Sequence, residues 1–176
     1  MKAKLLKPLA LLLFLLLGCS EDDVTEVPPP GPDIDSDLIE SLEVRLNPTG
    51  YAPLSATLTM ETTQSVSVEA TILGRRGAIS NVVRRSSGSA TSFEMDLFGL
   101  YADYENRVAI ALLDGSGNTL ETQTLSIQTG PLIADLPQIT IDTPSNASEL
   151  ELHFVNYFGF ANEFRPQRPF IFDQFG

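Results

Sequence analysis

Between Leu38 and Gly130 the sequence predicts an all-β domain, and three observations carry the prediction. Apolar and polar residues alternate in short runs, which is the period of strands with one buried face. Clusters of glycine, proline, asparagine and serine separate the runs, and no run keeps the 3.6-residue period of an amphipathic helix. About seven such runs at this spacing are typical of two packed sheets, so we expect an immunoglobulin or fibronectin type III-like β-sandwich.

Most of the expected strands follow directly from the alternation. They are Leu42–Leu46, Ala56–Met60, Val66–Ile72, Phe93–Leu97, Val108–Leu112 and Leu125–Ile127. Turns are expected between them, at residues 47–50, 62–64, 74–77, 86–89 and 114–118. The last of these begins with Asp-Gly, which is a strong signal for a hairpin. The stretch from Arg75 to Arg85 is ambiguous, and we interpret it as a further hairpin flanked by Arg75-Arg76 and Arg84-Arg85.

A structural corner is expected between the strands at Phe93–Leu97 and Val108–Leu112. A leucine, a polar turn, an aromatic residue and a strand follow one another there. This order is typical of the crossover between the two sheets of a sandwich, where a tyrosine caps backbone groups. The candidates for this corner are Tyr101, Tyr104 and Asn106, and we interpret the tyrosines as structural rather than as a platform for a ligand.

The first 18 residues are expected to be an export signal. Lys2, Lys4 and Lys7 form a basic head, and an apolar run of ten residues, Pro8–Leu17, follows it. That run is shorter than the roughly 20 residues that a membrane-spanning helix needs. It ends in Leu16-Leu17-Gly18-Cys19, which resembles a bacterial lipobox with cleavage just before the cysteine. We therefore expect Cys19 to carry the lipid that anchors the protein to a membrane.

Residues 19–37 are expected to be an acidic, proline-rich tether, because such segments stay extended and cannot bury a core. The acidic run Ser20–Asp23 resembles the surface-export tag of Bacteroidetes lipoproteins, although a solvated tether would read the same way. The expected location is the bacterial cell envelope, with the lipid in the outer membrane and the domain on its periplasmic or surface side.

Charge and composition exclude several kinds of function. Without residues 1–18 the chain has eight basic residues, all arginine, against 23 acidic ones, a net charge of −15. That charge disfavours nucleic acid as a partner. A single histidine, His153, and a single cysteine offer no metal-ligand spacing, and we expect no metal, no cofactor and no catalytic residue. Arg75, Arg76, Arg84 and Arg85 are the candidates for contact with an anion.

Two segments resemble the small N-terminal β-sandwich of bacterial aryl-sulfate sulfotransferases. Asn47–Leu54 is similar to the family segment Asn-Pro-Tyr-Gly-x-Ala-Pro-Leu, with Thr49 in place of the tyrosine. Gly99–Asn106 is similar to the family corner Gly-Leu-Tyr-Pro-Asp-Tyr-x-Asn, with Ala102 in place of the proline. The resemblance implies a non-catalytic domain, because the family transfers a sulfuryl group from an aryl sulfate to a phenol on a propeller that follows. It further implies a homodimer contact. The alternative is a stand-alone Ig-like surface lipoprotein that binds glycans or other ligands.

Residues 131–176 are expected to be a linker and the first strands of a propeller-type domain that is otherwise missing. Leu150, Leu152 and Phe154 alternate with polar residues, which indicates one strand. Pro169–Gly176 reads as a second strand followed by Asp-x-x-Gly, a hairpin return. Eight of the 14 aromatic residues lie from Phe154 onward, which is more apolar surface than a terminus leaves exposed. We therefore interpret the chain as the N-terminal piece of a longer protein.

Overall fold

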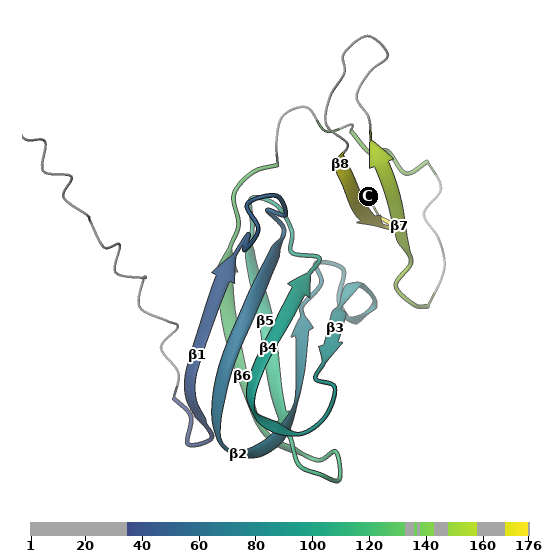
Figure 1. Cartoon of the computed structure of the whole chain (residues 1–176). Coiled ribbons are helices and arrows are strands. Elements are labelled where there is room, and N and C mark those ends of the chain that lie inside the picture. Colours follow the sequence, from purple (N-terminus) through teal and green to yellow (C-terminus); the bar gives the residue numbers. More distant parts are fainter. Residues whose placement is uncertain (1–34, 133–135, 137, 143–147, 158–167, 176) are drawn as a thin grey trace, which may run out of the picture. The chain divides into compact units, whose positions relative to one another are not determined.

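A computed structural model describes residues 35–132, 136, 138–142, 148–157 and 168–175, and confirms the all-β prediction (Figure 1). The strands in chain order are β1 (Ile39–Leu46), β2 (Ser55–Ile72), β3 (Val82–Arg85), β4 (Ala90–Phe98), β5 (Glu105–Leu113), β6 (Thr119–Gln128), β7 (Leu152–Tyr157) and β8 (Arg168–Asp173). A 3-10 turn, η1 (Ala78–Ser80), precedes β3. The predicted signal peptide, Cys19 and nearly all of the tether lie outside the described residues. Among the described residues, none forms a helix long and apolar enough to cross a membrane.

The first six strands form two antiparallel layers that share β2 (Figure 1). The first half of β2 pairs with β1 on one side and with β4 on the other. The second half pairs with β3 and with β5, and β6 adds to the free side of β5. The result is a curled antiparallel sheet whose halves pack face to face, which confirms the predicted Ig-like sandwich.

The expected turn at residues 62–64 lies inside β2 and does not interrupt it. The pairing of β2 with β4 shifts in register between Glu61 and Val66, and the strand changes layers across this shift. Ser55 pairs with Phe98 and Ile72 pairs with Val108, so both ends of β2 lie beside the Gly99–Tyr104 corner. The chain thus reverses direction where the turn residues predicted, but through a bend in one strand rather than a loop between two.

The predicted hairpin at Arg75–Arg85 is wrong in its boundaries. The strand β3 pairs with the end of β2, with Ile72 opposite Val82 and Glu69 opposite Arg85. The hairpin therefore consists of β2 and β3, and residues 74–81, with η1, are its loop. The alternation in β2 is continuous up to Ile72, so the strand that pairs with it has to come after the glycine-rich loop.

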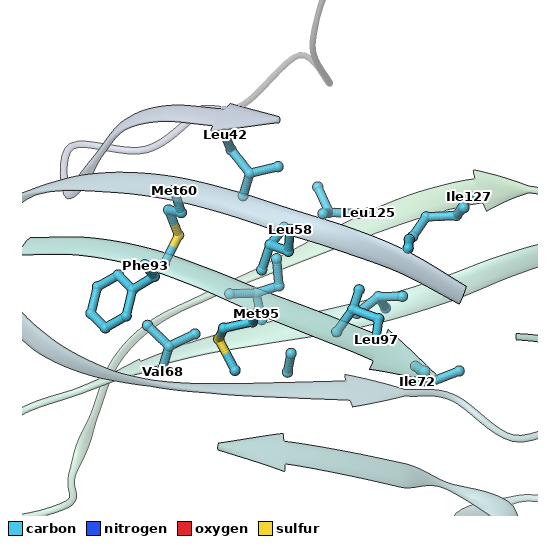
Figure 2. Close-up of a cluster of buried hydrophobic side chains, with 14 of the residues drawn as sticks. Leu42, Leu58, Met60, Val68, Ile72, Phe93, Met95, Leu97, Leu125 and Ile127 are labelled. Carbon is cyan, nitrogen blue, oxygen red and sulfur yellow. The ribbon is translucent and has the colours of Figure 1, made fainter. Parts of the chain in front are cut away.

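The core lies between the two layers and contains the alternating apolar residues of the sequence (Figure 2). The most completely buried large side chains are Leu58, Met60, Ile72, Leu97, Ile110 and Leu112. They come from β2, β4 and β5, so both halves of β2 contribute to one cluster. The polar residues between them point to the outside, which is what the two-residue period of a half-buried strand requires.

The turn between β5 and β6 is held by one carboxylate. Asp114 accepts hydrogen bonds from the backbone N–H groups of Ser116 and Asn118, each at 2.8 Å, and from the side-chain amide of Asn118 at 3.0 Å. The Asn118 bonds lower the pKa of Asp114 below its ordinary value. The Asp-Gly signal therefore predicted the turn correctly, and the carboxylate explains it as an Asx-type turn.

The strands β7 and β8 form a separate two-stranded antiparallel sheet, at the positions where alternation predicted short extra strands. Its register places Phe154 opposite Ile171 and His153 opposite Phe172. Phe154 is 68% exposed and Ile171 is 58% exposed. A two-stranded sheet of this kind is marginally stable alone in water.

Candidate functional site

Asn106, the second residue of β5, is the centre of the predicted corner. Its side chain is fully buried, and its Oδ1 accepts a 2.7 Å hydrogen bond from the backbone N–H of Tyr101. Its Nδ2 lies 3.0 Å from the carbonyl oxygen of Tyr101, 3.1 Å from that of Tyr104 and 3.4 Å from that of Ile127. A single amide thus satisfies backbone groups on both sides of the crossover, and within the described residues no buried side-chain nitrogen or oxygen lacks a partner.

Thr129 completes this network from the residue just after β6. Its hydroxyl bonds to the carbonyl oxygen of Tyr101 and lies 3.3 Å from Asn106 Nδ2. The backbone N–H of Thr129 donates to the carbonyl of Tyr104 at 3.1 Å, and the N–H of Asp103 donates to the carbonyl of Gly130 at 2.8 Å. The corner is therefore tied to the point where the chain leaves the sandwich. Thr129 was not among the predicted corner residues, and its position directly after the last strand and before Gly-Pro was the available signal.

Tyr101 and Tyr104 lie at the same corner, and their rings meet edge to face with centroids 5.8 Å apart. The Tyr101 hydroxyl accepts a 3.3 Å hydrogen bond from the backbone N–H of Arg75, in the loop between β2 and β3. The guanidinium of Arg75 lies 5.6 Å from the Tyr101 ring centroid and 5.1 Å from that of Tyr104. The structure thus brings Arg75 together with two of the three predicted corner residues, Tyr101 and Tyr104. We call Arg75, Tyr101 and Tyr104 the arginine–tyrosine cluster.

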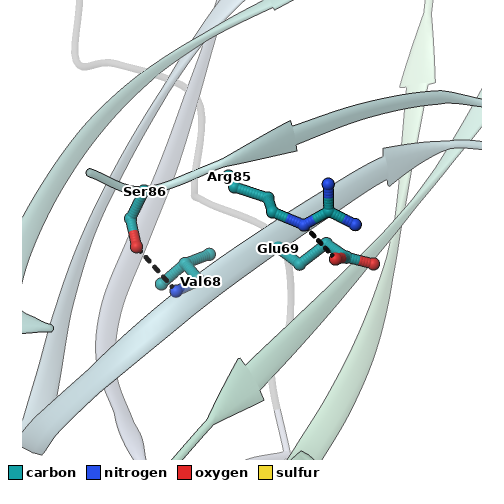
Figure 3. A network of polar contacts seen from close by, with 4 residues as sticks. All are labelled: Val68, Glu69, Arg85 and Ser86. Atoms are coloured by element: carbon teal, nitrogen blue, oxygen red, sulfur yellow. Dashed lines mark hydrogen bonds and ion pairs between the residues drawn. The ribbon is translucent and has the colours of Figure 1, made fainter. Parts of the chain in front are cut away.

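The other arginines proposed as anion contacts are engaged in different ways. Arg85 forms a 2.7 Å ion pair with Glu69 across β2 and β3, next to the 3.0 Å bond from the Val68 N–H to Ser86 Oγ (Figure 3). Arg84 donates from Nε to the carbonyl of Asp96 at 3.3 Å. Arg76 lies in the loop, and its backbone N–H donates to Ser80 Oγ. Arg84 and Arg85 therefore make different contacts, and binding of an anion by the four arginines stays a prediction.

The described residues contain no group of histidine, cysteine, aspartate or glutamate that could hold a metal ion. His153 is exposed on β7, and its ring stacks on Phe172 with centroids 5.2 Å apart. A hollow of 210 Å³ lies on the outer face of the first layer, lined by Glu43, Arg45, Thr57, Thr59 and Glu94. Its two carboxylates are exposed to solvent, so it offers none of the desolvation that makes a catalytic acid or base.

Gly74 positions the loop that carries Arg75. A Cβ added at Gly74 would lie 2.1 Å from Ser80 Oγ and 2.4 Å from the Ser80 carbonyl carbon. We therefore expect Gly74→Ala to lower the free energy of unfolding by about 1–3 kcal/mol, because the loop backbone has to move. Gly88→Ala is the matched control, since nothing lies within 4 Å of a Cβ at Gly88. Urea unfolding of the two variants measures the difference, and equal midpoints would contradict this account of the loop.

The antiparallel layers, the shared core and the capped corner define an immunoglobulin-like domain. Residues 43–130 match the family model described as the arylsulfotransferase Ig-like domain. This match spans half of the chain, and the chain belongs to that family. Both segments that carried the resemblance, Asn47–Leu54 and Gly99–Asn106, lie within the matched residues. No curated protein and no solved structure is significantly similar to the chain.

Proposed function

We propose that this chain is the non-catalytic N-terminal domain of an aryl-sulfate sulfotransferase-like exported lipoprotein. The match of residues 43–130 to the arylsulfotransferase Ig-like domain carries the proposal. The geometry of the matched region agrees with a structural role. Asn106 and Thr129 are buried and use their polar atoms on the backbone, so neither is available to a substrate.

In this proposal the sandwich connects an anchor to a catalytic domain. Cys19 carries the lipid, residues 19–37 form the tether, and the domain lies at the outer membrane on its periplasmic or surface side. The propeller that follows, rather than this chain, supplies the residues that transfer the sulfuryl group. A homodimer contact is part of the same proposal, and the net charge of −12 for the whole chain disfavours nucleic acid as a partner.

The sheet of β7 and β8 supports the proposal of a following β domain. Phe154 and Ile171 face one side of this sheet, and Val155 pairs with Phe170 on the other. Strands with apolar residues on both faces are typical of sheets that are covered on both faces. Strands of a propeller are covered in this way because neighbouring blades pack against each other. We therefore propose that β7 and β8 begin that domain.

A second candidate is a stand-alone surface lipoprotein that binds glycans. Its support is the exposure of aromatic side chains, with Tyr51 at 94% and Phe154 at 68%. Glycan binding would use such rings as stacking surfaces. Titrating the chain with neutral and acidic oligosaccharides, with Tyr51→Ala and Phe154→Ala as variants, separates the candidates. Binding that both variants reduce would favour this second function.

The principal test is a sulfuryl-transfer assay on the 176-residue chain, with an aryl sulfate as donor and a phenol as acceptor. We expect no turnover above the rate without protein, because the described residues form a sandwich and a two-stranded sheet and no propeller that could hold the donor. A complete member of the arylsulfotransferase family is the positive control. Turnover by the isolated chain that scales with its concentration would contradict the non-catalytic role.

A further inference from the structure

We propose that the arginine–tyrosine cluster is a docking point for a carboxylate of the polypeptide that follows Gly130. In this way the cluster fixes the direction in which the chain leaves the sandwich. The inference goes beyond the proposed function, since its occupant is a part of this chain. It holds or fails whether or not a catalytic domain follows.

The first step is that Arg75 is held in place but keeps its charge available. Its guanidinium is exposed and lies 5.1 and 5.6 Å from two tyrosine centroids, and its backbone N–H is bonded to Tyr101. Stacking on rings leaves the N–H edge of a guanidinium free to donate. The stack already restricts the Arg75 side chain. The side chain therefore loses less conformational entropy when a carboxylate binds to it.

The second step is that no acidic residue of the described sandwich takes this position. Asp103 and Glu105 flank Tyr104 in sequence and are exposed. The ion pair formed by the described residues joins Arg85 to Glu69 and leaves Arg75 without a carboxylate. The chain has 23 acidic residues against 11 basic ones. Arg75, whose side chain is already ordered and whose charge is not neutralised by the described sandwich, therefore attracts an acidic segment.

The third step is that the cluster lies where the chain leaves the sandwich. Backbone hydrogen bonds join Thr129 to Tyr104 and Gly130 to Asp103, so the polypeptide leaves the sandwich beside the backbone of Asp103 and Tyr104. Residues 131–176 contain six acidic residues and two arginines. Among the described ones, Asp142, Glu149 and Glu151 are exposed. We take these three carboxylates as the proposed occupants because of their charge and because the chain that carries them continues from this end of the sandwich.

The absence of lysine after Lys7 makes a direct test available. Arg75→Lys keeps the cation over the rings and introduces one amine. A water-soluble carbodiimide joins that amine to a carboxylate in direct contact with it, as an amide, and peptide mass spectrometry locates the bond. The full chain is used, and the unsubstituted chain gives the background from Lys2, Lys4 and Lys7.

We expect Arg75→Lys to form an intramolecular cross-link to a carboxylate after Gly130. We expect its yield to fall at least about twofold at 1 M salt, where the screening length is about 3 Å. Arg45→Lys is the matched control and should link to Glu43 or Glu94, which line the same hollow as Arg45. Links from position 75 only to Asp103 or Glu105, links only between isotope-labelled and unlabelled copies, or no link while the control succeeds would each overturn the inference.

Discussion

Replacing Leu58 by alanine is expected to lower the free energy of unfolding by about 3–5 kcal/mol. Leu58 is completely buried in the first half of β2, and it belongs to the cluster that both layers share (Figure 2). The strands on either side of it, β1 and β4, are held by their pairing with β2, so the surrounding side chains relax only partly into the cavity. Chemical denaturation followed by circular dichroism measures the change, and its midpoint should move without a change in slope.

Leu120→Ala is the matched control for this prediction. It is the same chemical change on a side chain that is 45% exposed at the start of β6. It should cost less than about 1 kcal/mol, since little apolar surface is withdrawn from water there. If the two variants were equally stable, Leu58 would not be part of a packed core, and the two-layer arrangement would be wrong.

Asn106→Ala is expected to lower the free energy of unfolding by about 2–4 kcal/mol, although it removes no apolar surface. The Tyr101 N–H would lose its acceptor, and the carbonyls of Tyr101, Tyr104 and Ile127 would lose a shared donor. These groups are enclosed by the corner, so water cannot replace the amide without opening it. Thermal unfolding and amide hydrogen exchange at residues 101–106 measure the loss.

Two variants separate the amide's role from its size. Asn106→Asp keeps the shape but replaces the donor by an acceptor that faces several carbonyls, so it should be at least as destabilising as alanine. Asn118→Ala removes an asparagine from the exposed turn between β5 and β6, where its Nδ2 donates to Asp114 at 3.0 Å, and should cost under about 1 kcal/mol. Full stability of Asn106→Asp would show that the amide does not hold the corner.

The alternation of apolar and polar residues predicted the sandwich because each half-buried strand requires that alternation within its own few residues. Leu58 and Met60 face the core while Thr59 between them faces outward, and no distant residue is needed to infer this. The turns were located for the same reason, since Asp114 and Asn118 act within a few residues of each other. The part of the fold that could be predicted from the sequence therefore depends mostly on residues that are close together in the chain.

The parts that sequence reasoning missed depend on contacts between distant residues. Thr129 reaches Tyr101 across 28 positions, and the backbone N–H of Arg75 reaches the Tyr101 hydroxyl across 26. The alternation of residues along a strand gives no information about hydrogen bonds between residues so far apart in the chain. The four arginines looked equivalent as two Arg-Arg motifs, yet only the pairing of β2 with β3 placed Glu69 beside Arg85. The resemblance of Gly99–Asn106 to a known corner carried the information that periodicity lacks.

The bend of β2 at residues 62–65 restricts where this domain can diversify. Domains of this type commonly vary a loop between the strands that correspond to the two halves of β2, and use such loops to recognise partners. Here that connection is itself a hydrogen-bonded strand, with the Thr62 hydroxyl 2.9 Å from the carbonyl of Gln64. An insertion there would break both layers at once. New recognition surfaces are therefore easier to acquire at the two ends of β2, which lie beside the corner at Gly99–Tyr104.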